Sequence, residues 1–136
     1  MATKIFINLP VKDLKKSMGF YGAVGFKNNP QFTDDTGACM VLTEDIYVML
    51  LTHDKFKSFT PKQIVDATKQ TEVLNALSYD SRAAVDEVVA KARRAGGSTY
   101  AEPKDHGFMY QHGFQDPDGH IFEVFWMDEK ALPPQQ

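Results

Sequence analysis

Glu123 is the residue of this sequence whose surroundings most favour chemistry. It stands between Phe122 and Val124, in an apolar run that follows the turn-forming sequence Asp-Pro-Asp-Gly at 116–119. A carboxylate in such a run must face a wet cavity, meet a cation or carry a proton, because an isolated buried charge is costly. We therefore expect Glu123 to line a functional site. The alternative is a hydrogen-bond acceptor for neighbouring strands or for a ligand hydroxyl.

A second group with chemical potential is the segment His-Gly-Phe-Met-Tyr-Gln-His at 106–112. Tyr110 and His112 alternate, so they share one face of a predicted strand. If that face looks into the same cavity as Glu123, His112 and Glu123 would form an acid–base pair, since a neighbouring carboxylate raises the proton affinity of an imidazole. His112 could instead give a nitrogen to an unconventional metal site. Otherwise, Tyr110 and His112 pack near the sheet edge with their polar ends in water.

Composition restricts the classes of function. The chain has 136 residues, 43% of them apolar and 12% aromatic, which suits one domain over residues 1–136 with a hydrophobic core. A net charge of -3, with basic and acidic residues intermixed, argues against a nucleic-acid partner. No apolar run has membrane-spanning length, and the single Cys39 cannot form an internal disulfide. We expect a cytoplasmic protein with no membrane partner.

The elements that must position these residues occur twice in the same order: strand, helix, three strands. In the first module, at about 4–52, we predict a strand at 4–11, a helix capped by Asp13 and ended by Gly25, and strands at 26–32, 38–43 and 46–51. In the second, at about 72–128, we predict a strand at 72–79, a helix from Asp80 or Ser81 to Gly96, and strands at 98–102, 109–115 and 120–127. This repeat predicts an α+β fold of two βαβββ modules, whose sheets curve into a cup with the helices on the outer face.

A connecting arm at 53–71 joins the modules. Thr60-Pro61-Lys62-Gln63 has the form of a helix-capping box with proline at the first helical position. Connections of this length are often binding or interface elements. The alternative is a loop that tucks Phe56 and Phe59 onto its own core.

Two motifs carry a resemblance to a known family. They are Val11-Lys12-Asp13-Leu14-x-x-Ser17-x-x-Phe20-Tyr21 and Phe114-x-Asp116-Pro117-Asp118-Gly119-x-x-x-Glu123. Together, in this order and at this spacing, they resemble the vicinal oxygen chelate superfamily, which includes glyoxalase I, extradiol dioxygenases and bleomycin-resistance proteins. The resemblance covers nearly the whole chain and implies the two-module fold. In the metalloenzymes of the family, the glutamate that corresponds to Glu123 is a metal ligand.

The resemblance also implies where the other metal ligands would stand, one on each of three further strands. Those positions hold Phe6, then Met49 or Leu50, then Leu74 with Val73 and Asn75 as its neighbours. Phenylalanine and leucine donate nothing, and a thioether is a poor ligand for hard ions. Because Glu123 alone cannot hold a catalytic divalent ion, we expect no metal at the usual site and no cofactor.

The metal-free branch of the family implies a function: binding a small organic molecule in a cup shared by a homodimer. We expect the ligand to contact the following residues: Phe6, Asn8, Leu50, Leu74, Tyr110, His112 and Glu123. A second hypothesis is a lyase or isomerase that uses an unconventional metal site or the His112/Glu123 pair. A third is an interaction module whose cup is filled by Phe6, Phe125 and Met127.

Overall fold

The computed structural model describes residues 3–131, so residues 1–2 and 132–136 of the predicted domain lie outside the described part. The first module contains β1 (Ile5–Val11), α1 (Leu14–Ala23), β2 (Lys27–Asn29), the 3-10 turn η1 (Pro30–Phe32), β3 (Gly37–Thr43) and β4 (Ile46–Thr52). The short helix α2 (His53–Lys57) opens the arm. The second module contains β5 (Asn75–Ser78), α3 (Arg82–Arg94), β6 (Lys104–Asp105), β7 (Met109–Gln115), β8 (Ile121–Met127) and the 3-10 turn η2 (Glu129–Ala131). The predicted α+β fold of two βαβββ modules is confirmed.

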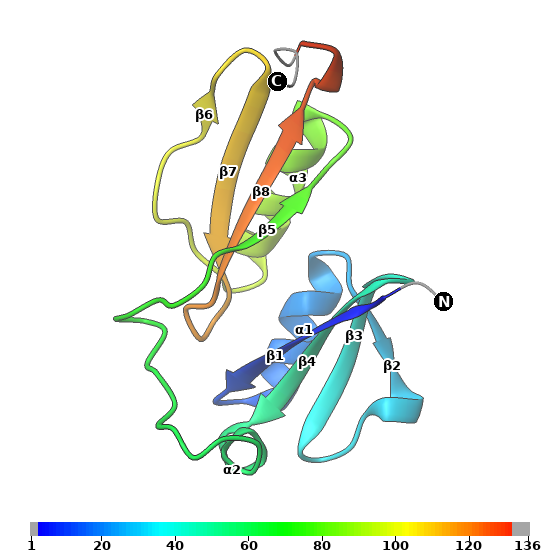
Figure 1. The fold of residues 1–136 in the computed structure, drawn as a ribbon, viewed down its shortest axis with the longest axis vertical. Helices are drawn as coiled ribbons and strands as arrows, with labels where there is room; N and C mark the ends of the chain where they lie inside the picture. The colour runs from blue at the N-terminus through cyan, green and yellow to red at the C-terminus, as the bar shows by residue number, and fades with distance from the viewer. Residues whose placement is uncertain (1–2, 132–136) are drawn as a thin grey trace.

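Each module forms its own four-stranded mixed sheet, with strand orders β1-β4-β3-β2 and β5-β8-β7-β6 (Figure 1). In both sheets the first strand of the module pairs in parallel with its last strand, which pairs antiparallel with the strand before it. Helix α1 packs on β3 and β4, and α3 packs on β7 and β8. The arrangement is open and does not close into a barrel. We call the face of each sheet opposite its helix the cup face.

The helices begin and end where the sequence predicts. The side chain of Asp13 caps α1, and the side chain of Ser81 caps α3. Gly25 and Gly96 follow the two helices with positive φ angles of 114° and 103°. Glycine adopts this left-handed conformation without the Cβ strain of other residues, so it stops each helix.

Four predicted elements differ in the structure. The strand at 72–79 is confined to β5. The strand at 26–32 is confined to β2, because Pro30 opens η1 and the Asn29 side chain accepts from the Gln31 amide. The strand at 98–102 is reduced to a single bridge between Ser98 and Gln115. No helix follows Thr60: its hydroxyl accepts from Lys62 in a tight turn, and the arm's helix is α2, capped by Thr52. Local hydrogen bonds of Asn and Thr side chains compete with helix and sheet at these positions.

The two modules share one hydrophobic core, which α1 joins together. Phe20 of α1 packs on Phe114 of β7 with 6.0 Å between ring centroids. Tyr21 packs edge-on against Phe122 of β8 at 5.9 Å. All four side chains are buried. Successive side chains of a strand point to opposite faces, so the core residues of each sheet lie on its helix side. The residues between them point to the cup face.

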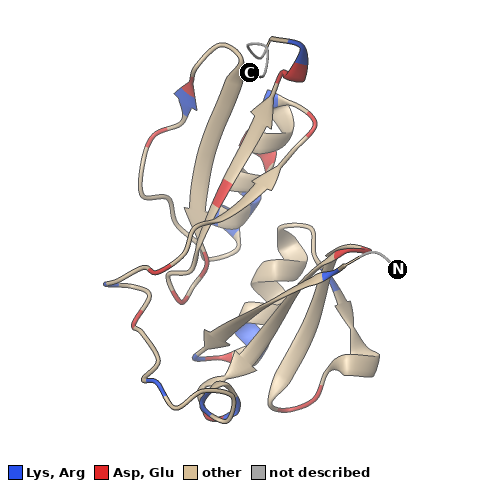
Figure 2. Cartoon of the chain, viewed as in Figure 1, with Lys and Arg blue, Asp and Glu red and all other residues tan. Residues whose placement is uncertain are grey.

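No helix within residues 3–131 combines the length and apolar character needed to cross a bilayer. Basic and acidic residues are intermixed over the chain, and the strands carry few of either (Figure 2). Glu123 is the one charged residue of β8.

Candidate functional site

The two motifs that carry the family resemblance meet in space, at the junction between the modules. The Asp118 carboxylate accepts hydrogen bonds from the Lys12 amide at 2.9 Å and from the Ser17 hydroxyl at 3.3 Å. The buried Tyr21 hydroxyl donates to Asp116 at 2.6 Å. Burial raises the pKa of Tyr21 and that of Asp116. The turn of the second motif therefore holds the start of helix α1 and fixes one module on the other.

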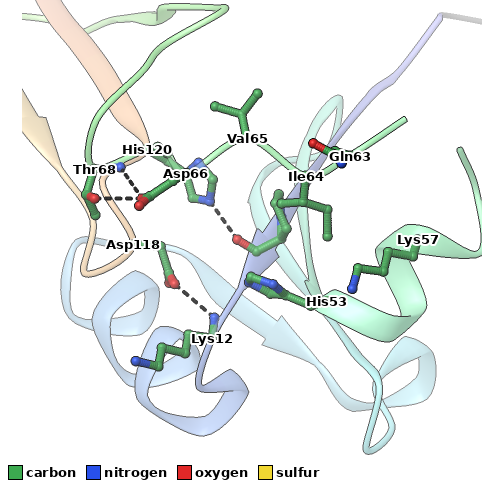
Figure 3. A pocket seen from close by; sticks show the side chains of 12 residues that line it. Lys12, His53, Lys57, Gln63, Ile64, Val65, Asp66, Thr68, Asp118 and His120 are labelled. Carbon is green, nitrogen blue, oxygen red and sulfur yellow. Dashed lines mark hydrogen bonds between the residues drawn. The ribbon is translucent and has the colours of Figure 1, made fainter. Parts of the chain in front are cut away.

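The same turn also fixes the connecting arm. Gly119 has a φ of 92°, and a Cβ atom there would stand 2.6 Å from the Ala67 carbonyl oxygen of the arm. The His120 imidazole meets the Pro10 carbonyl oxygen through Nε2 at 2.7 Å (Figure 3). Glycine is required at 119 both by its backbone conformation and by the close approach of the arm. We call Asp116–His120, with the groups it contacts, the module junction.

The cup face of the second module carries Glu123. Phe122 and Val124 point into the core, so Glu123 between them faces the cup, where it is half-buried. Its partner in β7 is Gly113, which has no side chain to cover it. The Tyr100 hydroxyl lies over Gly113, beside the Glu123 carboxylate. Burial, together with this contact, raises the pKa of the Tyr100 phenol far above its ordinary value.

His112 and Glu123 both border a small recess at Gly113, but within residues 3–131 they are not hydrogen-bonded to each other: Nδ1 of His112 accepts from the Gly113 amide. His112 pairs with Val124, so its side chain is on the helix side of the sheet, opposite the cup face. His112 is 8% exposed, and burial, followed by the positive charge of Arg93, lowers its pKa. Because the two side chains occupy opposite faces, the predicted acid–base pair is not assembled in the described chain.

Tyr110 shares the face of His112. Its hydroxyl hydrogen-bonds the Asp86 carboxylate of α3, which raises the pKa of Tyr110 to about 12. The expectation that Tyr110 lines the cup is therefore corrected: its hydroxyl reaches the helix. Tyr110 and His112 do share one face of β7, as the alternation predicts. The burial of Phe114, two residues after His112, shows that this face points to the helix.

The first module contributes aromatic and amide groups to its cup face. Phe6 of β1 stacks on Tyr47 of β4 with 4.4 Å between ring centroids, and 49% of its surface stays exposed. Asn8, exposed on the same face, donates through Nδ2 to the Phe6 carbonyl oxygen at 3.1 Å. Phe6 and Asn8 are therefore accessible, as the prediction requires.

The strand register decides between the two predicted positions on β4. Met49 pairs with Asn8 and faces the cup, whereas Leu50 pairs with Leu9 and is fully buried in the core. The assignment of Leu50 to the ligand site is therefore corrected by one residue. Leu74, which precedes β5, is 56% exposed.

The residues at the family's metal-ligand positions do not fit a divalent ion. Those positions hold Phe6, Met49, Leu74 and Glu123. Within residues 3–131, no three His, Cys, Asp or Glu side chains converge as a metal site would need.

A hollow of about 640 Å³ lies beneath the connecting arm (Figure 3). Pro10 and Lys12 at the end of β1, His53 and Lys57 of α2, and Ile64 of the arm line it. Asp118 of the junction closes one side, with its carboxylate on the Lys12 amide (Figure 3). The length of the arm was the only sequence signal for this hollow.

Sequence reasoning missed Tyr47 and Tyr100. Tyr100 lies in a segment that was predicted to be a strand and is a loop. Gly113 offers the one signal for it, since a lone glycine inside a strand often marks the close approach of another group. A Cβ atom at 113 would stand 2.1 Å from the Tyr100 hydroxyl oxygen.

Comparisons with known proteins agree with this architecture. The sequence profile of the Glyoxalase/Bleomycin resistance protein/Dioxygenase superfamily matches residues 5–124. The structure of hypothetical protein SA1046 from S. aureus is similar, with 31% identity, a TM-score of 0.78, and coverage of 93% of this chain and 95% of that chain. No curated protein matches the sequence.

Two further structures share the fold at lower identity. One is a glyoxalase/bleomycin resistance protein/dioxygenase family enzyme from Burkholderia phytofirmans PsJN, with 20% identity, a TM-score of 0.75, and coverage of 93% of this chain and 99% of that chain. The other is the fosfomycin resistance protein FosX from Listeria monocytogenes, with 18% identity, a TM-score of 0.68, and coverage of 96% and 97% respectively. The two-module fold with an open cup face defines the vicinal oxygen chelate class. The chain belongs to the glyoxalase/bleomycin resistance protein/dioxygenase superfamily.

Proposed function

We propose that this protein binds a small organic molecule on its cup face without a divalent metal at the family's usual site. The observation that carries the proposal is Phe6: a half-exposed ring, stacked on Tyr47, stands where the family's metalloenzymes hold a ligand. Stacked aromatic rings offer a flat apolar surface, and Asn8 beside them offers directed hydrogen bonding. Such a surface suits an organic molecule better than an ion.

The protein acts as a homodimer whose two copies share their cups. Strands β1 and β5 are edge strands, each paired on one side only within residues 3–131. Exposed apolar side chains lie at these edges: Ile5, Phe6, Val73 and Leu74. An edge with unpaired backbone groups and apolar side chains is suited to covering by another chain. The mixed surface charge and the single buried Cys39 support a cytoplasmic location.

Two measurements test the binding proposal. In the first, calorimetry follows the titration of chelator-treated protein and of its Glu123→Ala variant with Zn²⁺, Mn²⁺, Ni²⁺ and Fe²⁺. We expect no stoichiometric binding by either protein. Tight binding that is lost in Glu123→Ala would contradict the metal-free proposal.

In the second measurement, amide spectra by NMR follow the titration of small aromatic compounds into ¹⁵N-labelled protein. We expect shifts at Phe6 and Asn8 that disappear in Phe6→Ala and persist in Phe32→Ala. Phe32 is a matched control because it is 64% exposed but lies in η1, outside β1. Equal loss in both variants, or no shift with any compound, would contradict binding on this face. A monomeric mass by light scattering at micromolar concentration would contradict the homodimer.

A further inference from the structure

A second, smaller recess opens on the cup face of module two. It holds about 60 Å³, and its lining includes Tyr100, Glu102, Lys104, Gln111 and Glu123. About 10–15 Å³ of such volume holds one water molecule, so the recess is of a size for a small polar group. It is suited to the head group of a larger molecule whose body stays on the open cup face.

Gly113 makes this recess possible. Gly113 pairs with Glu123 of β8 and has no side chain, so its backbone forms the floor of the recess below the Tyr100 ring. Any larger residue at 113 would displace the Tyr100 hydroxyl, because even a Cβ would stand 2.1 Å from it. The Tyr100 ring thus covers the floor, and the recess remains open between the ring and the carboxylate.

The recess offers hydrogen-bond acceptors to a ligand. A carboxylate has two oxygens and about four lone-pair sites, and that of Glu123 lies open to the recess beside the Tyr100 phenol. The raised pKa of Tyr100 keeps this phenol protonated and neutral near pH 7. Gln111, on the cup face of β7, adds an amide oxygen. A bound group that donates several hydrogen bonds would find acceptors here.

The charge of the recess favours a cation. The lining carries two carboxylates, those of Glu102 and Glu123, and one ammonium group, that of Lys104. His112 also borders the recess, and burial lowers its pKa, so the lining has an excess of one negative charge near pH 7. An anion would meet both carboxylates and a phenol that cannot neutralise them. Ile121 and Phe125 flank Glu123 on the same face and are half-buried, which provides apolar contact for the rest of a ligand.

We propose that this recess is the head-group subsite for a small organic amine, with Glu123 as the principal acceptor and the apolar body of the amine on Ile121 and Phe125. The inference deepens the proposed function and rests on it, since it names the chemical class of the molecule that the cup face binds. An ammonium group donates three hydrogen bonds and carries one positive charge, which matches the free acceptors and the excess charge.

Three probes of nearly equal shape test the subsite: benzylamine, benzyl alcohol and benzoate. Each is titrated at pH 7 into ¹⁵N-labelled protein, and the Gly113 and Glu123 amides are followed by NMR. Benzylamine should shift both amides, and benzoate should bind at least about tenfold more weakly, because a charge-assisted hydrogen bond is lost. Equal affinity for benzoate, or no shift with benzylamine, would overturn the amine subsite.

Variants with opposite expected effects separate recognition from misfolding. Glu123→Gln should weaken benzylamine about tenfold or more. Lys104→Gln removes the competing cation and should tighten binding about threefold. Glu44→Gln, in the β3–β4 turn of the other module, should change nothing. Unchanged affinity in Glu123→Gln would overturn the subsite, as would a weaker affinity in Lys104→Gln.

Failure of this inference differs from failure of the proposed function. If all three probes bind the cup face equally and independently of Glu123, the amine subsite is wrong while small-molecule binding stands. If the aromatic compounds leave Phe6 and Asn8 unshifted, the proposed function fails whatever happens at Gly113.

Discussion

The polar groups of the module junction have hydrogen-bond partners within the protein, whereas those of the cup face are largely open to solvent. At the junction, the carboxylates of Asp116 and Asp118 accept from a buried phenol, a hydroxyl and backbone amides. On the cup face, Phe6 and Asn8 are exposed, and the half-buried Glu123 lies beside the Tyr100 phenol. Buried polar groups need partners to be stable, so the junction is built for stability. Exposed rings and free acceptors contribute little to folding and are available to a ligand.

This comparison changes how the sequence motifs should be understood. The residues that reveal the family, from Asp13 to Tyr21 and from Asp116 to Gly119, hold the modules together. Among the motif residues, only Glu123 faces the cup. Family membership is therefore evident from residues that fix the fold, whereas specificity depends on cup-face residues outside the motifs.

The largest expected difference is between two phenylalanines. Phe20→Ala in the core that joins the modules should lower the free energy of unfolding by about 4 kcal/mol, because it leaves a cavity there. Phe6→Ala on the cup face should lower it by less than about 1 kcal/mol, since the ring is half exposed. Urea denaturation of the two variants measures both. A larger loss of unfolding free energy for Phe6→Ala than for Phe20→Ala would contradict the assignment of Phe6 to the cup face rather than to the core.

Asp116→Ala should cost about 3 kcal/mol in the free energy of unfolding, because the buried Tyr21 hydroxyl and two backbone amides lose their acceptor. Asp128→Ala is the matched control: it removes a carboxylate that accepts from one exposed amide, that of Lys130. Chemical denaturation monitored by circular dichroism gives both values. Equal costs for the two variants would show that the junction contacts add no special stability.

Gly119→Ala should cost about 2 kcal/mol, because alanine is strained at a φ of 92° and its Cβ presses on the arm at Ala67. Gly107→Ala shares the positive φ, at 83°, but has open space around it. The difference between the two melting temperatures isolates the contact with the arm. No difference would mean that the arm moves away freely.

The smallest effect concerns pH. His112 has a lowered pKa in the folded protein, so the unfolded state binds its proton more readily. The contribution of His112 to stability is therefore complete above the unfolded pKa of about 6.5 and declines as the pH falls below it. His112→Gln should flatten the dependence of stability on pH just below about 6.5, while the exposed His106→Gln should not. An unchanged slope in His112→Gln would contradict the buried, neutral histidine.

Local signals in the sequence predicted many of the elements. Asp13, Ser81, Gly25 and Gly96 fix helix ends through caps and positive φ, which depend on near neighbours alone. Alternation in β8 placed Glu123 on the face opposite Phe122. The two-residue strand β6 and the loop that carries Tyr100 were missed, because a segment of this composition forms a strand only where a partner is available.

The sequence by itself determined the two-module order, the family resemblance and the poor fit of Phe6, of Met49 or Leu50, and of Leu74 to metal ligation. These properties follow from residue type, spacing and local backbone preference. The tertiary structure decided which face of β7 looks into the cup, which register places Leu50 in the core, and what Tyr100 contacts. Strand alternation defines two faces but does not say which is buried, since burial depends on the helix that packs there. The proposed amine recess exists only because a loop, a glycine and a carboxylate from three separate segments come together.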